Sequence, residues 1–571
     1  MRSWDTGAGG TDSSRTGRYG EINRREHPAY CPLLSPDSEQ LFSVIILPCG
    51  QAFISLNTSQ SEGNSMDAIE RTLFCTRIQS ICEEMGAVLQ RTAFSPNIRD
   101  RLDFSCAVFD EHGRLCAQAA HIPVHLGSMA YAMHDIVKRF QWNQGDTVIL
   151  NDPYLGGTHL PDITLVTPVF VDGTLYGFVA NRAHHADIGA VTPGSMPVAK
   201  TLDEEGHLIP PVYLARGEKI LDSTLTGILQ HVHNPTITRA DLNAQNSTNR
   251  RGAVLLSTLI NKTGAEIFHS SLSEINSYAE NMARTGLRDI PPGIYEFQDV
   301  MDDDGAGTRA IPIRVKISIT QEQIIVDFSG TSPQVPGNIN CPLSVTAAAV
   351  YYTFYCLMPE QTPACAGSFR PIAIHAPEAS LVNAVFPAAV AAGNVETSTR
   401  IVDVVLGALA QAIPDRIPAA SHGTMNNIAM GSETWDYYET LGGGTGGGPA
   451  TRGCNAIQTH MTNTLNTPVE ILEMHYPINI QRYQVRRGSG GAGRHPGGDG
   501  IIREFRFMED ATVTLLCERR IHSPWGLSGG GPGQKGINLL NNKIIPGKTT
   551  ISVKAGDRIC IQTPGGGGWG A

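Results

Sequence analysis

The sequence predicts an α+β protein of several domains, in which helices mix with β-hairpins and the C-terminal part is glycine-rich and mainly β. Three observations support this fold class. Apolar residues recur at helical spacing over residues 66–92. Over residues 311–331 they alternate with period two, as in a β-hairpin. About half of the 60 glycines follow residue 420, where they separate short strand-like segments.

Length and composition indicate the domain organisation. A chain of 571 residues that is 41% hydrophobic and 17% charged has enough apolar material for more than one core. We expect a flexible N-terminal extension at 1–65, an α+β domain at 66–235, a middle region of helices and a β-hairpin at 236–420, and a glycine-rich, mainly β region at 421–571.

Charge and composition also exclude some classes of function. The 43 Lys and Arg residues against 54 Asp and Glu give a net charge of -11, and no basic cluster occurs, so nucleic acid is not an expected partner. The apolar run LFSVIIL at 41–47 ends at Pro48 and is too short to span a membrane. Since the 12 cysteines include no C-x-x-C pair, we expect reduced thiols and a cytoplasmic location.

The N-terminal elements follow from periodicity. A helix is predicted over 66–92 with Asp67 as its N-cap. Its apolar stripe contains Ile69, Leu73, Ile78, Ile81, Met85 and Val88. Residues 106–118 predict two short strands around a turn, and residues 126–140 a second helix. A hairpin is expected over 162–182, because two apolar runs flank an Asp-Gly pair.

The middle region is predicted to mix helices with one hairpin. Residues 238–285 contain few helix breakers, which indicates one or two helices. The alternating stretch at 311–331 predicts a hairpin around a polar turn, and helices are expected at 344–357 and 397–412, the latter with a threonine cap. In the last third, the glycines either let the backbone approach a ligand or a neighbouring chain, or belong to flexible surface loops.

Polar residues that carry chemistry gather at the open end of the 162–182 hairpin. One end of the hairpin carries His159 and Asp162, and the other carries His184, His185 and Asp187. Imidazole nitrogens and carboxylate oxygens suit a divalent ion such as zinc, manganese or iron. The spacing lacks an H-E-x-x-H pattern, so histidines that only hydrogen-bond to loop backbone are the alternative.

Two hairpin registers are possible. If a two-residue loop at 172–173 joins the strands, Asp162 shares its side of the sheet with His185. If the loop has three residues, 171–173, Asp162 shares its side with His184 instead. In both registers the polar ends of the two strands meet.

Other residues could add to this site. His121 and His125 precede the second helix, and either could join the cluster or be satisfied by local backbone. Arg99, Arg101 and Arg182 could hold a phosphate or carboxylate, or form surface salt bridges. Neither a P-loop nor a G-x-S-x-G motif occurs, so the sequence carries no nucleotide-binding motif of these kinds.

From about Met66 onward the chain resembles the hydantoinase B family. That family comprises the B component of ATP-dependent N-methylhydantoinase, the C-terminal half of 5-oxoprolinase, and related subunits of caprolactamase and acetone carboxylase. The resemblance rests on six stretches: FSPNIRDRLDFSCAVFD, HIPVHLGSM, NDPYLGGTHLPDITLVTPVF, GFVANRAHHADIGAVTPGSMP, SPWGLSGGGPG and TPGGGGWG.

The resemblance implies a function and a division of labour. A hydantoinase A-type partner would use ATP to phosphorylate a small cyclic amide, and this B-type chain would open the activated lactam. Alternatives are an acetone-carboxylase-like subunit and a non-catalytic scaffold. By similarity to the carboxylase subunit, His159, Asp162 and His184 would hold the metal, which favours the three-residue loop. His185 or Asp187 would then shuttle a proton or orient the ligands.

Overall fold

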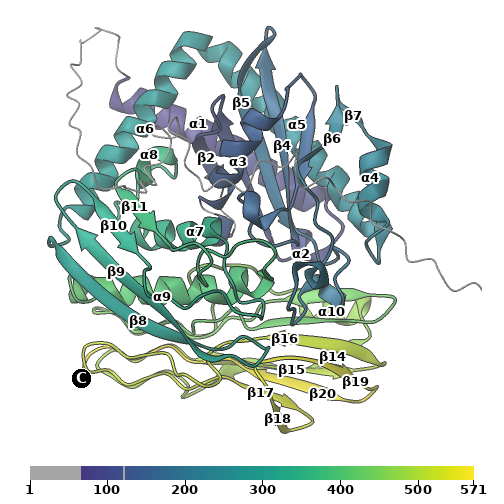
Figure 1. Ribbon diagram of the computed structural model, residues 1–571, viewed down its shortest axis with the longest axis vertical. Helices are drawn as coiled ribbons and strands as arrows, with labels where there is room; N and C mark the ends of the chain where they lie inside the picture. Colours follow the sequence, from purple (N-terminus) through teal and green to yellow (C-terminus); the bar gives the residue numbers. More distant parts are fainter. Residues whose placement is uncertain (1–65, 120–121, 126) are drawn as a thin grey trace, which may run out of the picture. The chain divides into compact units, whose positions relative to one another are not determined.

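The computed structural model describes residues 66–119, 122–125 and 127–571. The predicted N-terminal extension at 1–65 and His121 lie outside the described residues. In the described part, strands form sheets of seven, four, four and five strands, and helices pack on and between them (Figure 1). The predicted α+β class, with helices, hairpins and a mainly β C-terminal part, is confirmed.

The seven-stranded sheet carries the predicted hairpin near its centre. Its strand order is β2-β1-β5-β4-β3-β6-β7. The strands are β1 (Phe104–Asp110), β2 (Leu115–Ala119), β3 (Thr147–Leu150), β4 (Asp162–Val171), β5 (Thr174–His184), β6 (Val212–Arg216) and β7 (Lys219–Ile220). Its helices are α1 (Ala68–Thr92), α2 (Pro96–Arg99), α3 (Ser128–Arg139), α4 (Asp222–Leu229), α5 (Pro235–Thr263) and α6 (Ala265–Leu287).

Side chains of β5 alternate between two cores. Val179 and Ala183 belong to the cluster that includes α1, α5 and α6, whereas Phe178 and Ala180 belong to the cluster that includes α3. Since successive side chains of a strand point to opposite faces, this alternation fixes the side on which each residue at the end of β5 emerges.

Helix α1 confirms the predicted cap. The Asp67 carboxylate accepts from the backbone N–H of Glu70, and the Glu70 carboxylate accepts from the N–H of Asp67, so a capping box closes the helix start. The buried stripe differs in part from the predicted one, because Ile69 and Leu73 are exposed. Its buried members are Phe74, Ile78, Ile81, Cys82, Met85, Gly86 and Leu89.

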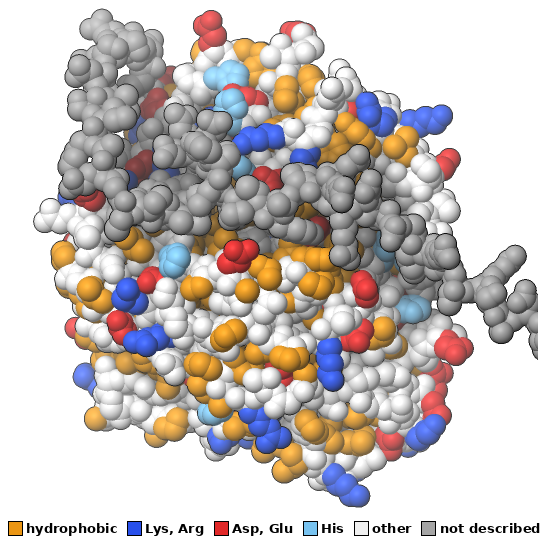
Figure 2. All heavy atoms as spheres, in the orientation of Figure 1, with side chains coloured by type: hydrophobic (Ala, Val, Ile, Leu, Met, Phe, Trp, Pro, Cys, Tyr) orange, Lys and Arg blue, Asp and Glu red, His pale blue; other side chains and the backbone are white. Residues whose placement is uncertain are grey.

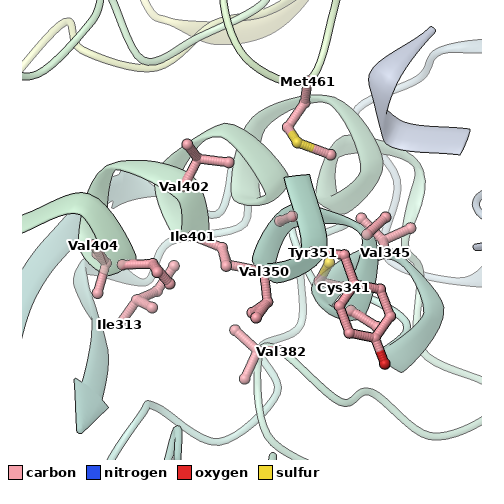
Figure 3. Close-up of a cluster of buried hydrophobic side chains, with 14 of the residues drawn as sticks. Ile313, Cys341, Val345, Val350, Tyr351, Val382, Ile401, Val402, Val404 and Met461 are labelled. Carbon is pink, nitrogen blue, oxygen red and sulfur yellow. The ribbon is translucent and has the colours of Figure 1, made fainter. Parts of the chain in front are cut away.

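The middle of the chain packs two helices against a four-stranded sheet of order β11-β10-β9-β8. These elements are β8 (Gly293–Asp303), β9 (Arg309–Ile319), β10 (Ile324–Asp327), α7 (Leu343–Tyr355), α8 (Ala366–Phe369), β11 (Ile372–His375) and α9 (Ser398–Leu409). The predicted hairpin is β9 and β10, while β8 was not predicted. Figure 3 shows Val350 of α7 and Ile401 of α9 pointing toward one another within the core.

The predicted threonine cap of α9 is wrong. Thr397 donates its hydroxyl to the carbonyl of Ile339, instead of to the helix. A π-helical turn, Gly393–Thr397, precedes α9 and continues into it. Such turns are rare and frequently occur at functional sites.

The last third forms two further sheets, of order β13-β12-β16-β19 and β14-β15-β20-β17-β18. The strands are β12 (Asn427–Gly431), β13 (Asp436–Glu439), β14 (Ile478–Arg486), β15 (Gly500–Phe507), β16 (Ala511–Leu516), β17 (Ile537–Leu540), β18 (Lys543–Ile545), β19 (Lys548–Val553) and β20 (Arg558–Gln562), and α10 spans Val469–His475. One apolar cluster contains residues of both sheets, including Ile428, Phe505 and Val513. The predicted β character is confirmed.

The glycine-rich loops pack on one another within the chain. A Cβ at Gly498 would lie 1.8 Å from the carbonyl oxygen of Cys454, and one at Gly566 would lie 1.9 Å from that of Thr445. The N–H of Gly566 donates to the carbonyl of Gly498, and the N–H of Gly498 donates to that of Thr445. These glycines are buried. The close backbone approach is therefore to other loops of the same chain, and the flexible-surface-loop alternative is wrong for them.

Two further findings concern the surface. None of the described helices is both long enough and apolar enough to cross a bilayer. On the face seen in Figure 2, acidic and basic side chains are interspersed among hydrophobic ones. Every described cysteine is a free thiol. The domain boundaries and the cytoplasmic location stay predictions.

Candidate metal centre

The register of the β4–β5 hairpin brings Asp162 opposite His184. Asp172 and Gly173, with φ of 48° and 78°, form a two-residue turn between the strands. A β-bulge then inserts Tyr176 between the paired positions, which shifts the register by one residue. Both predicted registers are therefore wrong: the loop has two residues, and the bulge places the aspartate directly across from the histidine.

Three side chains meet at this end of the hairpin. His159 Nε2 lies 3.2 Å from Asp162 Oδ1, and His184 Nδ1 lies 3.3 Å from the same oxygen. One ligand atom from each residue lies within 4.8 Å of the others. All three residues are at most 2% exposed. We call His159, Asp162 and His184 the triad.

The triad contains polar atoms that the protein leaves without hydrogen bonds. Among the described residues, both ring nitrogens of His159, Oδ1 of Asp162 and Nε2 of His184 have no hydrogen-bond partner. More than about 90% of buried polar groups in proteins are hydrogen-bonded, so such a group of orphaned atoms is unusual. Two atoms that each lie about 2.1 Å from one ion are about 3.0–3.4 Å apart at octahedral or tetrahedral angles. The observed separations match that spacing, so the residues fit a divalent cation.

Neighbouring side chains hold the Asp162 carboxylate in place. Its Oδ2 lies 3.3 Å from His125 Nε2 and accepts from the Thr158 hydroxyl at 2.5 Å. His125 Nδ1 lies 2.9 Å from the Ser105 hydroxyl. His125 thus joins the cluster through side-chain contacts, and the alternative that local backbone satisfies its ring is wrong. With Oδ2 occupied in this way, Oδ1 faces the two triad histidines.

Electrostatics favour an ionised carboxylate at the triad. Burial opposes charge on Asp162, but His159 and hydrogen bonding from His125 and the triad histidines outweigh it and hold the pKa of Asp162 well below its usual value. Burial lowers the pKa of His184, which keeps its ring neutral. Burial also opposes charge on His159, yet Asp162 raises the pKa of that ring. A proton on His159 therefore competes with a cation.

A small cavity of about 20 Å³ adjoins the triad, with room for about one water molecule. Tyr438 forms part of its wall, and its ring stacks on the His184 ring at 4.8 Å. Asn394, from the π-helical turn, is also in the wall, and its Oδ1 has no partner among the described residues. Sequence reasoning missed Tyr438 and Asn394, because no spacing pattern links residues so distant in the chain. The other wall residues are Asp103, Ile122, Val124, His125, Asp162, Val395, Met425, Thr440, Thr462 and Thr464.

Comparison with known proteins places the chain in a family. A family model described as hydantoinase B/oxoprolinase matches residues 67–571. The chain belongs to this family. The resemblance inferred from sequence motifs is thereby confirmed.

Relatives of this hydantoinase B/oxoprolinase chain differ in length. It is 39% identical over 542 residues to 5-oxoprolinase 1 of Arabidopsis thaliana, a match that covers 89% of this chain but 42% of that protein. It is 30% identical over 538 residues to the putative B-type subunit of a D-/L-hydantoinase from a Pseudomonas species, covering 88% of this chain and 90% of that protein. The crystal structure of ATP-dependent caprolactamase from Pseudomonas jessenii is similar with a TM-score of 0.83 at 26% identity, covering 89% of this chain and 92% of that one.

The two predicted proton shuttles of this hydantoinase B/oxoprolinase chain do not join the triad. His185 Nε2 lies 3.0 Å from Gln245 Oε1 on α5, on the opposite face of the strand from His184. Asp187 accepts from the backbone N–H of Asn234 at 2.6 Å. Both line a separate pocket. The structure thus brings together three of the five predicted residues, and the shuttle role of the other two stays a prediction.

The three arginines differ in their environments. Arg101 and Arg182 are fully buried, and they donate to the carbonyl of Tyr438 and the hydroxyl of Thr164. Burial lowers the pKa of Arg182 to about 10. Arg99 is partly exposed and pairs with the next residue, an aspartate. A surface salt bridge therefore describes Arg99 alone, and the buried pair is bound to the protein itself.

Proposed function

We propose that this chain is the B-type component of an ATP-dependent cyclic amide hydrolase. In this proposal His159, Asp162 and His184 hold a divalent cation, and a lactam that a partner A-type component has phosphorylated is opened beside them. The observation that carries the proposal is the set of buried triad atoms without hydrogen bonds. Membership of the hydantoinase B/oxoprolinase family and the relatives named 5-oxoprolinase and caprolactamase support the substrate class.

The chemistry asks for an activated amide and an activated water. Nitrogen resonance stabilises an amide carbonyl against attack by water, and phosphorylation of the carbonyl oxygen removes much of that stabilisation. A divalent cation supplies Lewis acidity, which makes water nucleophilic at neutral pH.

The chain's own residues would position these groups. His125 and Thr158 fix the Asp162 carboxylate so that one oxygen stays available. Tyr438 stacks on His184 and orients its ring. Asn394, with its side-chain oxygen free of partners among the described residues, would accept a hydrogen bond from the lactam N–H or from the attacking water.

The partner is proposed because of the lengths of the relatives and the motifs of the chain. The chain spans 42% of the length of 5-oxoprolinase 1. The hydantoinase relative, which the chain spans almost fully, is named as one component of a larger enzyme. Since the sequence carries no P-loop, we assign the ATP site to an A-type partner.

Co-expression with an A-type hydantoinase component tests the proposal. We expect ATP cleavage that depends on 5-oxoproline or N-methylhydantoin and on both components, with a divalent metal present in the purified complex. The exposed His375 offers a matched control, because His375→Ala removes an imidazole distant in sequence from the triad and should leave activity and metal content unchanged.

Three outcomes would contradict the proposal in different ways. Lactam-dependent turnover by the lone chain would remove the need for the partner. Product formation that requires bicarbonate would indicate a carboxylase. Full activity of His159→Ala in the complex, with no change in metal content, would leave a scaffold role.

A further inference from the structure

A second pocket, larger than the triad cavity, opens beyond the end of β5. Its volume is about 270 Å³. Phe94, Trp435 and Tyr476 contribute aromatic walls, while Asp187 and Asp436 contribute carboxylates. The proposed function uses none of these carboxylates for metal binding.

Three ligand-type side chains converge beside this pocket. Asp187, His233 and Asp436 each offer one ligand atom, and these atoms all lie within 4.8 Å of one another. His233 Nδ1 lies 3.3 Å from Asp187 Oδ1. The three residues come from the loop after β5, the segment before α5 and the first position of β13. They are therefore brought together only by the tertiary fold.

Backbone groups hold both carboxylates in position. The N–H of Asn234 donates to Asp187 Oδ2 at 2.6 Å, and the N–H of Gly194 donates to Asp436 Oδ1 at 3.0 Å. A carboxylate oxygen has a second lone pair, so these contacts orient the groups and leave capacity for a cation.

An independent observation also points to a missing ligand. Ser95 lies in the pocket wall and is 5% exposed, yet its hydroxyl has no hydrogen-bond partner among the described residues. Buried hydroxyls are nearly always paired with protein or with ordered solvent. The Ser95 hydroxyl is therefore available to a water or an oxygen ligand held in the pocket.

The charge around the pocket is unbalanced. Asp187 and Asp436 repel one another, and the guanidinium of Arg99, which also lines the pocket, is directed to Asp100 at 2.8 Å. A cation between the two carboxylates would remove that repulsion.

We propose that Asp187, His233 and Asp436 form a second divalent-cation site, distinct from the triad. Two carboxylates and one imidazole suit Mn²⁺ or Zn²⁺ and leave coordination positions open toward the pocket. The bound cation ties the N-terminal sheet, the start of α5 and the C-terminal β13 together.

Equilibrium dialysis of the full chain against Mn²⁺, with metal counted by elemental analysis, tests the site. We expect two equivalents in the unaltered chain and one in His233→Ala or Asp436→Asn. His233 is about half exposed, so its replacement does not threaten folding. The matched control is His475→Ala, which removes another imidazole from the same pocket and should keep both equivalents.

The triad variant separates this inference from the proposed function. His159→Ala should lose the other equivalent, and the double variant His159→Ala with Asp436→Asn should lose both. Mn²⁺ is paramagnetic, so quenching of Trp435 fluorescence should persist in His159→Ala and disappear in Asp436→Asn, with Trp435→Phe identifying the signal.

Several results would overturn the site. These are a single equivalent that His159→Ala removes, two equivalents that survive in both His233→Ala and Asp436→Asn, and a second equivalent seen only at millimolar Mn²⁺, as for an adventitious ion only. A single equivalent that His233→Ala removes and His159→Ala leaves intact would support the second site and contradict the triad.

Discussion

The triad and the glycine loops of the last third treat buried polar groups in opposite ways. At the triad, side chains converge and several of their atoms lack partners among the described residues. In the glycine loops, side chains are absent and backbone groups pair closely, as between Gly566 and Gly498. Unpaired polar atoms cost stability, so they persist where a ligand supplies the missing contact. The comparison separates residues kept for binding from residues kept for folding.

The largest effect should follow from removing a triad ligand. We expect Asp162→Asn to lose the bound cation and to reduce lactam-dependent turnover in the complex to background, beyond the roughly 10- to 100-fold typical for residues that only orient metal ligands. The amide keeps the size of the carboxylate, so the thermal midpoint of the metal-free chain should change little. Elemental analysis, turnover and thermal unfolding measure the three quantities. Retention of the cation would show that the triad is structural.

The next largest effect should come from the glycine loops. In Gly498→Ala the new methyl would overlap the carbonyl of Cys454, so we expect the free energy of unfolding to fall by about 3 kcal/mol or more. Cation binding per folded chain should stay the same. Denaturant unfolding measures the loss.

The control for that prediction is Gly227→Ala. Gly227 lies inside α4, and nothing comes within 4 Å of a Cβ added there. We expect this change to stabilise the chain by about 1 kcal/mol. Equal losses in both variants would contradict the packing role of the glycine loops.

A smaller effect is expected at Asn394. In Asn394→Ala the complex should keep its cation but lose about 10-fold in kcat/KM, because the side-chain oxygen in the cavity wall is gone. Steady-state kinetics with metal analysis on the same preparation separates substrate positioning from metal loss. Unchanged kcat/KM would place Asn394 among structural residues.

The hairpin site could be predicted from sequence because its parts are near in the chain. An Asp-Gly turn between two apolar runs indicates a hairpin, and any hairpin brings His159 close to His184. The register could not be predicted, since the bulge at Tyr176 leaves no residue-type signal. Strand alternation also separates His185 from His184, although the sequence predicts both in one cluster.

Contacts between distant segments stayed beyond sequence reasoning. Asn394 reaches the cavity through a π-helical turn, and Asp436 reaches Asp187 through the packing of separate sheets. The glycine loops show the same limit, because composition shows that the backbone is bare but not which segment lies against it.

The smallest predicted effect concerns Glu396, which shares the π-helical turn with Asn394. Burial, reinforced by Glu518, raises the pKa of Glu396 to about 8, against an ordinary value of 4.5. Between these values the folded chain binds more protons than the unfolded chain, so the free energy of unfolding falls as pH rises across this window. The slope from one group is at most about 1.4 kcal/mol per pH unit.

Glu396→Gln should remove this slope, because the amide mimics the protonated acid. Its oxygen can still accept from the N–H of Met425 and the amide of Asn427. Comparing denaturant unfolding at pH 6 and pH 7, we expect the unaltered chain to lose about 1 kcal/mol more than the variant. The exposed Glu378 supplies the control, since Glu378→Gln should keep the slope. If Glu396→Gln kept it as well, Glu396 would be ionised in the folded chain, and the π-helical turn would carry a buried charge that stabilises a ligand instead of a neutral acid that stabilises the fold.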